Sequence, residues 1–212
     1  MREKLYIIGA GSVGGHLALN LSQYNPDYEL CGFFDDAPQK KDTDFCGHPI
    51  LGPVSDVMHI GEASLFLGIA FPKIKKRIFE ELKGKTMFHW PSFIHKRAWV
   101  SEDATIGEGS IVYPGASINY GSDICKFVVI NMNCALGHHT SIGNFSSLAP
   151  GVNTGGHTSI GNTVEMGIGA STKQNIRIGD GSVIGGMAFV NGDIPRDSVA
   201  FGVPAKLADK KP

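Results

Sequence analysis

One periodicity constrains this chain more than any other feature. Between residues 94 and 190 an aliphatic residue recurs every six positions, with no insertion and with only Thr154 and Thr172 breaking the rule. The residue four places after each of these is small or β-branched, and glycine or asparagine often follows the aliphatic residue directly. The repeated positions are Ile94, Val100, Ile106, Val112, Ile118, Ile124, Ile130, Leu136, Ile142, Leu148, Thr154, Ile160, Met166, Thr172, Ile178, Ile184 and Val190.

This period excludes a helix, whose apolar positions recur about every 3.6 residues and which tolerates glycine poorly. Six residues instead form a short strand and a turn, and three such units close one triangular coil. We expect the aliphatic side chains to fill the interior, and glycine or asparagine to make tight corners where φ is positive. This is the signature of a hexapeptide parallel β-helix. With coils ~4.8 Å apart, the seventeen units predict between five and six coils and a prism roughly 27 Å tall.

The front of the chain follows a different pattern. The motif GAGSVG at residues 9–14 matches GxGxxG, and it lies between a predicted strand (KLYIIGAG) and a helix expected from about Gly14 to Tyr24. Two more strands (YELCGFFDD and ASLFLGIA) and an amphipathic helix (KIKKRIFEELKGK) follow. The predicted fold class is therefore α/β plus all-β. A small Rossmann-like domain over residues 1–90 precedes a β-helix domain with a C-terminal tail over residues 91–212.

Two ligands compete for the glycine loop. One is NAD, with Asp35 or Asp36 on the ribose, about twenty residues after the loop. The other is a nucleotide sugar, with phosphate near the helix N-terminus and the two aspartates accepting hydrogen bonds from base or ribose. The glycines also serve a tight strand-to-helix turn without any ligand. Half a dinucleotide fold fused to a β-helix favours the nucleotide sugar.

Composition excludes some partners. The net charge of -1 and the absence of a basic stripe give no reason to expect a nucleic-acid partner. The apolar run near the N-terminus is too short for a signal h-region or a membrane span, so we expect a cytoplasmic protein without membrane contact. The four cysteines form no CxxC pair, and we interpret them as reduced thiols that fill space.

Several strings, in this order, resemble one enzyme family. They are IIGAGSVG, FFDD, ILGPVSDV, FIHKRAWV, GHHTSIGNFSSLAPG and GVPAKL. Together they are similar to the hexapeptide-repeat sugar O- and N-acyltransferases of the NeuD/PglD type, which acetylate sialic acid or nucleotide-linked amino sugars. The resemblance implies a left-handed β-helix, a homotrimer with active sites between subunits, and acetyl-CoA bound in the groove between two prisms.

The resemblance also implies roles for individual residues. In the family, a histidine four residues before a repeat isoleucine, here Ile142, is the general base, which implies His138. The following residue is usually acidic and hydrogen-bonds the base, whereas this chain has His139. The family's loop histidine is replaced by Val13 and a glycine after its third strand by Ala70. The implied contacts are Gly156, Ile168 and Gly186 for acetyl-CoA, and Ser12, Val13, Gly14, Asp35, Asp36 and Ala70 for the nucleotide sugar.

Coil arithmetic gives a physical reason for His138 as base. One coil has eighteen residues, so Gly156 is expected about one strand spacing, ~4.8 Å, above His138. A glycine there leaves room for the acetyl group, and its N–H can stabilise an oxyanion. Imidazole, with an ordinary pKa near 6.5, is suited to take a proton from an attacking amine or hydroxyl. We expect direct attack in a ternary complex, with Cys134 and Ser146 serving in packing.

The same arithmetic stacks His139 on His157. The pair can hold His138 by hydrogen bonding, contact the acceptor, or bind a metal. Two imidazoles alone make a poor zinc site, so no metal is expected. Asn131, at a corner one hexad before Gly137, is either an acceptor contact or a structural corner residue.

The leading functional prediction is acetyl transfer from acetyl-CoA to an amino or hydroxyl group of a nucleotide-linked sugar. One alternative is an NAD(P)-dependent oxidoreductase that uses the glycine loop, and another is a non-catalytic sugar-nucleotide-binding protein. The sugar, the nucleotide, the acceptor atom and the acyl length are left open, as is the group that orients His138.

Overall fold

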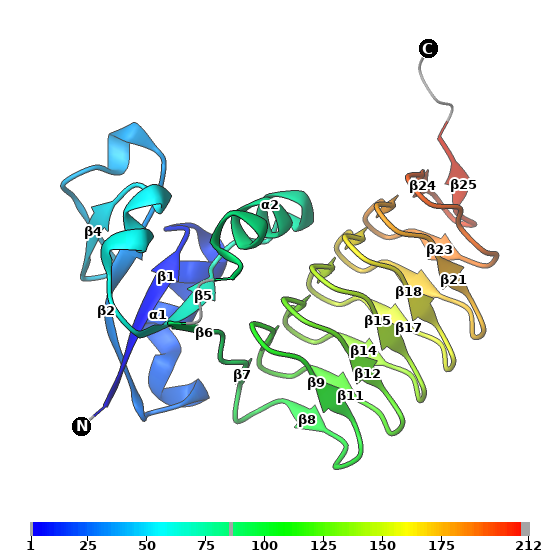
Figure 1. The fold of residues 1–212 in the computed structure, drawn as a ribbon. Helices are drawn as coiled ribbons and strands as arrows, with labels where there is room; N and C mark the ends of the chain where they lie inside the picture. Colours follow the sequence, from blue (N-terminus) through cyan, green and yellow to red (C-terminus); the bar gives the residue numbers. More distant parts are fainter. Residues whose placement is uncertain (1, 85–86, 209–212) are drawn as a thin grey trace. The chain divides into compact units, whose positions relative to one another are not determined.

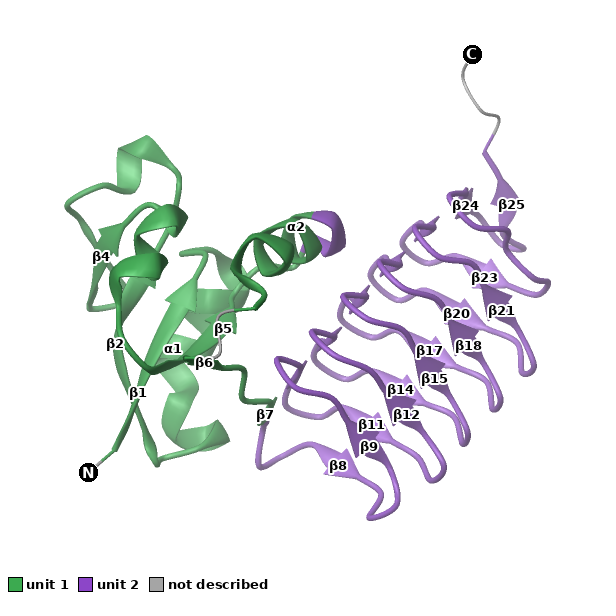
Figure 2. Cartoon of the chain, in the orientation of Figure 1, with its two compact units in different colours: residues 1–70, 74–93 green, residues 71–73, 94–212 purple. Residues whose placement is uncertain are grey.

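A computed structural model describes residues 2–84 and 87–208 and divides the chain into two compact units (Figures 1 and 2). The first unit comprises residues 1–70 and 74–93, and the second comprises residues 71–73 and 94–212. Each unit has a sheet system of its own. Within the described residues, no helix has both the length and the hydropathy needed to cross a bilayer.

The first unit is built on a six-stranded sheet in the order β3-β4-β2-β1-β5-β6. Its pairs are parallel except for the short β3–β4 hairpin. The strands are β1 (Glu3–Ile8), β2 (Tyr28–Phe34), β3 (Asp44–Phe45), β4 (His48–Gly52), β5 (Ala63–Leu67) and β6 (Phe88–His89). The helices are α1 (Ser12–Tyr24) and α2 (Pro72–Leu82), with 3₁₀ turns η1 (Pro38–Lys40) and η2 (Val54–His59).

This unit agrees with the Rossmann-type prediction in its main elements. The three predicted strands are β1, β2 and β5, and the first helix begins two residues earlier than expected, at Ser12. The predicted second helix is α2, and the last residue of its predicted segment, Lys85, lies outside the described residues. Strands β3, β4 and β6 were not predicted, because two of them are only two residues long and Pro49 interrupts the third.

Lys75 occupies a buried position on α2, together with the apolar residues Ile78 and Leu82. Burial disfavours the charged ammonium and lowers the pKa of Lys75 from 10.5 to about 7. The unfolded chain keeps this proton up to about pH 10.4, so between pH 7 and that value it binds more protons than the folded chain. The free energy of unfolding should therefore rise with pH across this window. Urea unfolding at pH 7 and pH 9 should show this rise. In Lys75→Met the rise should be smaller. An equal rise of the free energy of unfolding in the native and Lys75→Met proteins would contradict the prediction.

The second unit is a parallel β-helix whose three faces are the three remaining sheets. One face contains β7 (Phe93–Ile94), β10 (Ile111–Val112), β13 (Val129–Ile130), β16 (Ser147–Leu148), β19 (Glu165–Met166), β22 (Val183–Ile184), β24 (Val199–Phe201) and β25 (Lys206–Leu207). The second contains β8 (Trp99–Val100), β11 (Ser117–Ile118), β14 (Ala135–Leu136), β17 (Asn153–Thr154), β20 (Ser171–Thr172) and β23 (Phe189–Val190). The third contains β9 (Thr105–Ile106), β12 (Asp123–Ile124), β15 (Ser141–Ile142), β18 (Ser159–Ile160) and β21 (Arg177–Ile178).

The register of these strands confirms the eighteen-residue coil. Ile118 pairs with Leu136 and Leu136 with Thr154, and the other two faces repeat the same offset. The repeated aliphatic residues from Val112 onward form one continuous buried core. Ile94 is an exception, with 37% of its surface exposed, because it lies in the first coil and no earlier coil of the β-helix covers it.

The corners differ from the prediction in one respect. Positive φ falls three residues after the aliphatic position, on glycines such as Gly121 and also on Phe127, His139 and His157. The glycines directly after the aliphatic residue do not have positive φ; at Gly137, for example, a Cβ would come within 2.6 Å of the Gly156 backbone nitrogen. The assignment of positive φ to those glycines was therefore wrong, and close approach of successive coils is the reason for them.

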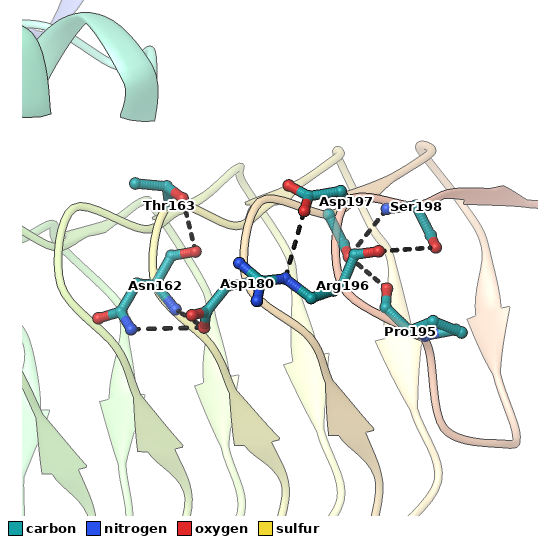
Figure 3. A network of polar contacts seen from close by, with 8 residues as sticks. Asn162, Thr163, Asp180, Pro195, Arg196, Asp197 and Ser198 are labelled. Atoms are coloured by element: carbon teal, nitrogen blue, oxygen red, sulfur yellow. Dashed lines mark hydrogen bonds and ion pairs between the residues drawn. The ribbon is translucent and has the colours of Figure 1, made fainter.

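Side chains at another corner tie successive coils together. The Asn144 and Asn162 backbone N–H groups donate to side-chain oxygens one coil further on, those of Asn162 (2.8 Å) and Asp180 (2.7 Å). Figure 3 shows the end of this ladder, where Asn162 lies beside Asp180 and the Arg196 side chain reaches Asp197. These bonds satisfy amides that the turns leave without backbone partners.

Candidate active site

The corner that carries His138 is held from inside by two threonines. Thr140 Oγ1 donates to the Gly137 carbonyl at 2.7 Å and lies 3.0 Å from Thr154 Oγ1. The Gly137 N–H in turn reaches Thr154 Oγ1 at 3.0 Å. Thr154 therefore departs from the aliphatic rule because its buried hydroxyl helps to fix the backbone one residue before His138.

His138 lies between an aromatic ring and a bare backbone. The Tyr120 ring stacks on the imidazole, with centroids 5.4 Å apart and planes 13° apart. On the opposite side, a Cβ at Gly156 would lie 2.6 Å from His138 Nε2. The expected juxtaposition of His138 and Gly156 is thus present. Tyr120 was not predicted as a site residue. It lies eighteen residues, or one coil, before His138, so the eighteen-residue offset that identifies Gly156 also identifies Tyr120 when it is subtracted.

The second nitrogen of His138 faces its neighbour. His138 Nδ1 lies 3.1 Å from His139 Nδ1. One of these nitrogens must carry a proton and donate the hydrogen bond, and the other must accept that bond through its lone pair. If His138 is the donor, its Nε2 keeps a free lone pair in the plane of the ring, which is the tautomer that a base requires. His139 thus occupies the position from which an orienting group acts.

His157 completes a group of three imidazoles. Its ring stacks on His139 with centroids 4.7 Å apart and planes 11° apart, as the coil arithmetic predicted. It also meets His138 edge-on at 4.9 Å. One ring nitrogen from each histidine lies within 4.8 Å of the other two. The sequence analysis considered only His139 and His157 as a possible metal pair, and the structure adds His138 to the group.

The coils below His139 leave room for its ring. A Cβ at Gly121 would lie 2.7 Å from His139 Cδ2, so a larger residue there would displace the imidazole. One coil further down, Asp103 accepts hydrogen bonds from Ser101 and from the Gly121 amide. These bonds lower the pKa of Asp103, and the charge of a protonated His139 lowers it further. Asp103 is an acidic group near His139 that the sequence analysis did not identify.

Ile168 and Gly186 lie at a different corner from His138. They follow β19 and β22, whereas His138 and Gly156 follow β14 and β17. The two predicted acetyl-CoA positions stack on each other, with the Ile168 carbonyl 3.3 Å from a Cβ built at Gly186. Ile168 is 64% exposed. Gly156 therefore lies at one edge of the face that contains β14, β17 and β20, and Ile168 and Gly186 lie at the other edge of that face.

Three other residues have clear structural roles. Cys134 is fully buried, and burial raises its pKa to about 11, so its thiol stays protonated at neutral pH. Ser146 Oγ donates to the Gly161 carbonyl and accepts from the Val164 amide. Both observations support packing rather than nucleophilic roles. Asn131 Oδ1 accepts the Met132 amide at 2.8 Å, a bond typical of a corner residue.

The glycine loop of the first unit is clamped by a pair of charged residues. Lys40 Nζ donates to Asp35 Oδ2 at 2.8 Å and to the Ala10 carbonyl at 2.9 Å. Asp35 also accepts the amides of Ala10 and Ala37. Desolvation alone would raise the pKa of Asp35, but the hydrogen bonds from Lys40, Ala37 and Ala10 together lower it. A carboxylate has about four acceptor sites, so Asp35 retains one for a ligand.

The other predicted substrate residues differ in access. Ser12 and Asp36 are exposed, and Asp36 Oδ1 holds the Val54 amide at 2.8 Å. Val13 is buried, so its side chain is not open to a ligand. Ala70, after β5, is half-buried. Lys40 gave no sequence signal, because it lies in a polar segment without periodicity.

Gly14 allows helix α1 to begin directly against the sheet. A Cβ at this position would lie 2.2 Å from the Gly9 carbonyl oxygen, whereas a Cβ at Gly11 would meet no atom within 4 Å. We expect Gly14→Ala to lower the free energy of unfolding of this unit by about 1–3 kcal/mol, a typical cost of overpacking. Gly11→Ala is the matched control, and denaturant unfolding measures both. Equal stability of the two variants would contradict the prediction.

Comparison with known proteins agrees with this geometry. Residues 4–82 match the PglD N-terminal domain family. The acetyltransferase domain of PglB from Neisseria gonorrhoeae is 28% identical, with a TM-score of 0.88, over 98% of this chain and 100% of that one. The same domain has been solved with acetyl coenzyme A. A mutant of perosamine N-acetyltransferase from Caulobacter crescentus, solved with CoA and GDP-perosamine, is 25% identical, with a TM-score of 0.87, over 98% and 97% of the two chains.

The Rossmann-type unit, the left-handed β-helix and these likenesses together define an acyl-CoA-dependent sugar acetyltransferase. Residues 4–82 match the PglD N-terminal domain, and over nearly its whole length the chain is similar to sugar acetyltransferases of the NeuD/PglD type. The fold class and the family resemblance drawn from the sequence are thereby confirmed, and the oxidoreductase alternative is not favoured.

Proposed function

We propose that this enzyme transfers an acetyl group from acetyl-CoA to the amino group of a nucleotide-linked sugar, with His138 as the general base. The observation that carries the assignment is the position of His138, whose ring lies over Gly156 while its Nδ1 lies 3.1 Å from His139 Nδ1. An amino group is the favoured acceptor because the perosamine enzyme, whose substrate complex resembles this chain, is an N-acetyltransferase.

The reaction needs one proton to move twice. The acceptor amine attacks the thioester carbonyl, a C–N bond forms, and His138 Nε2 takes the proton from the amine. The Gly156 amide is the proposed donor to the oxyanion of the tetrahedral intermediate. When the C–S bond breaks, the same proton passes from His138 to the thiolate, and CoA leaves as a thiol. Throughout, His138 Nδ1–H donates to His139, which keeps the ring oriented.

The two units divide the substrates between them in this proposal. The β-helix domain, residues 91–212, binds acetyl-CoA through Gly156, Ile168 and Gly186. The Rossmann-like domain, residues 1–90, binds the nucleotide sugar at the start of α1 and at Asp35 and Asp36. Asn131 remains a candidate acceptor contact. We also propose that the enzyme acts in the cytoplasm.

We also propose a homotrimer, which the family resemblance implies, and the separation of the cofactor residues supports a site between two copies. His138 and Ile168 lie at opposite edges of one face in a single chain. A cofactor that contacts both kinds of residue is accommodated if two copies pack side by side, each contributing a different corner. Light scattering on the purified protein should therefore give three times the mass of one chain.

Purified enzyme, acetyl-CoA and a panel of UDP-, GDP- and dTDP-linked amino sugars test the proposed reaction. Free thiol should accumulate with at least one amino sugar, and mass spectrometry should find one acetyl group on that sugar. The matched sugars with hydroxyl in place of the amine should release far less thiol. Binding of a sugar nucleotide without thiol release would favour the non-catalytic alternative.

A further inference from the structure

We propose that His138, His139 and His157 bind a divalent transition-metal cation of the zinc class, and that the bound cation stops His138 from acting as a base. The binding itself rests on the geometry of the three rings. Only its effect on turnover rests on the proposed function.

The ligand chemistry fits such a cation. Neutral imidazole is a preferred ligand of zinc, and three histidines with an open fourth position form a common zinc-binding set. The three rings come from two successive coils, and one nitrogen from each lies within 4.8 Å of the others. His139 and His157 are exposed and His138 is half-buried, so a cation and its water can reach the group from solvent.

The spacing of the first two nitrogens already suits a metal. Zinc–nitrogen bonds of 2.0–2.1 Å in tetrahedral geometry place two ligand nitrogens about 3.4 Å apart. His138 Nδ1 and His139 Nδ1 are 3.1 Å apart. His157, whose ring stacks parallel to that of His139, must turn to direct its lone pair at the same point. Its exposure leaves it free to do so.

Metal binding has a specific consequence for His138. In the proposed mechanism, His138 donates its Nδ1 proton to His139, 3.1 Å away, and keeps the Nε2 lone pair free to take a proton from the acceptor. A cation bound to Nδ1 uses the lone pair of that nitrogen, so the single proton of the neutral ring moves to Nε2. No proton is lost, but the nitrogen that faces the acceptor becomes a donor. The ring can then no longer remove a proton from the amine.

Direct binding is measured first, with the full-length chain free of any histidine tag. Titration with Zn²⁺ by calorimetry should show one site per chain, and Co²⁺ should give the visible absorption of a tetrahedral complex. His157→Gln and His139→Gln should each weaken Zn²⁺ binding by about tenfold or more, the scale on which even supporting residues affect metal affinity. His89→Gln, a change at an exposed histidine outside the group, should leave binding unchanged.

Turnover is measured second. Zn²⁺ should inhibit acetyl transfer in the concentration range in which it binds, EDTA should restore activity, and His157→Gln should shift the inhibition midpoint upward as much as it shifts binding. If Zn²⁺ does not bind, or binds equally to the His157→Gln protein, the proposed site is wrong. If Zn²⁺ binds at the three histidines and turnover continues, the site stands and the role of His138 as base is contradicted.

Discussion

Replacing His138 with alanine should lower kcat by about 10²–10⁴, the range that a positioned general base contributes. The ring has no part in the buried core of the β-helix, since its recorded neighbours are Tyr120, His139, His157 and the Gly156 backbone. The variant should therefore keep its thermal stability and its affinity for acetyl-CoA. Thiol release under saturating substrates measures the loss, and circular dichroism with calorimetric CoA binding checks the fold.

Two comparisons make the result specific to the base. His89→Ala removes an exposed histidine that pairs with the exposed Glu62, and should leave kcat unchanged. Added imidazole should partly restore the His138→Ala enzyme, because a small free base fits the space left by the ring. A His138→Ala protein that turns over at the native rate would show that another group takes the proton.

The stacking of residues from successive coils is the structural feature that the sequence predicts best. An unbroken six-residue register determines which residues lie one above another, so the pairings of His138 with Gly156 and of His139 with His157 follow from position alone. The same register explains Thr154, because a buried hydroxyl in place of a methyl group becomes useful where the corner beside it must be fixed.

Conformation and local side-chain bonding were harder to predict. Glycine after the aliphatic residue looked like a positive-φ residue, but a repeat cannot distinguish a strained φ from a close contact between coils, and the structure shows the second. The clamp of Lys40 on Asp35 and Ala10 depends on how one side chain folds back over a polar turn, for which no pattern exists. The bond between His138 and His139 likewise depends on side-chain rotation at one corner.

Gly156 is the second position at which a single change should nearly abolish activity. An alanine Cβ there would lie 2.6, 2.7 and 3.0 Å from three atoms of the His138 ring, closer than real Cβ contacts allow. Because His138 is half-buried, the ring can turn away toward solvent, which costs some stability and removes Nε2 from its place. A displacement of ~1 Å in a reacting group costs about 10² in rate.

Gly156→Ala should therefore lower kcat by about 10² or more, while Gly192→Ala, whose new Cβ meets no atom within 4 Å, should leave kcat unchanged. A double-mutant cycle separates the contact with His138 from damage elsewhere, because residues in contact give non-additive free energies of unfolding. Alanine at 138 removes the ring that the new methyl group strikes, so the stability lost in Gly156→Ala should be largely recovered in the double variant, although activity remains lost. Additive stability effects would mean that the new methyl group does not strike the His138 ring, and native turnover in Gly156→Ala would mean that the reaction does not depend on the position of this ring over Gly156.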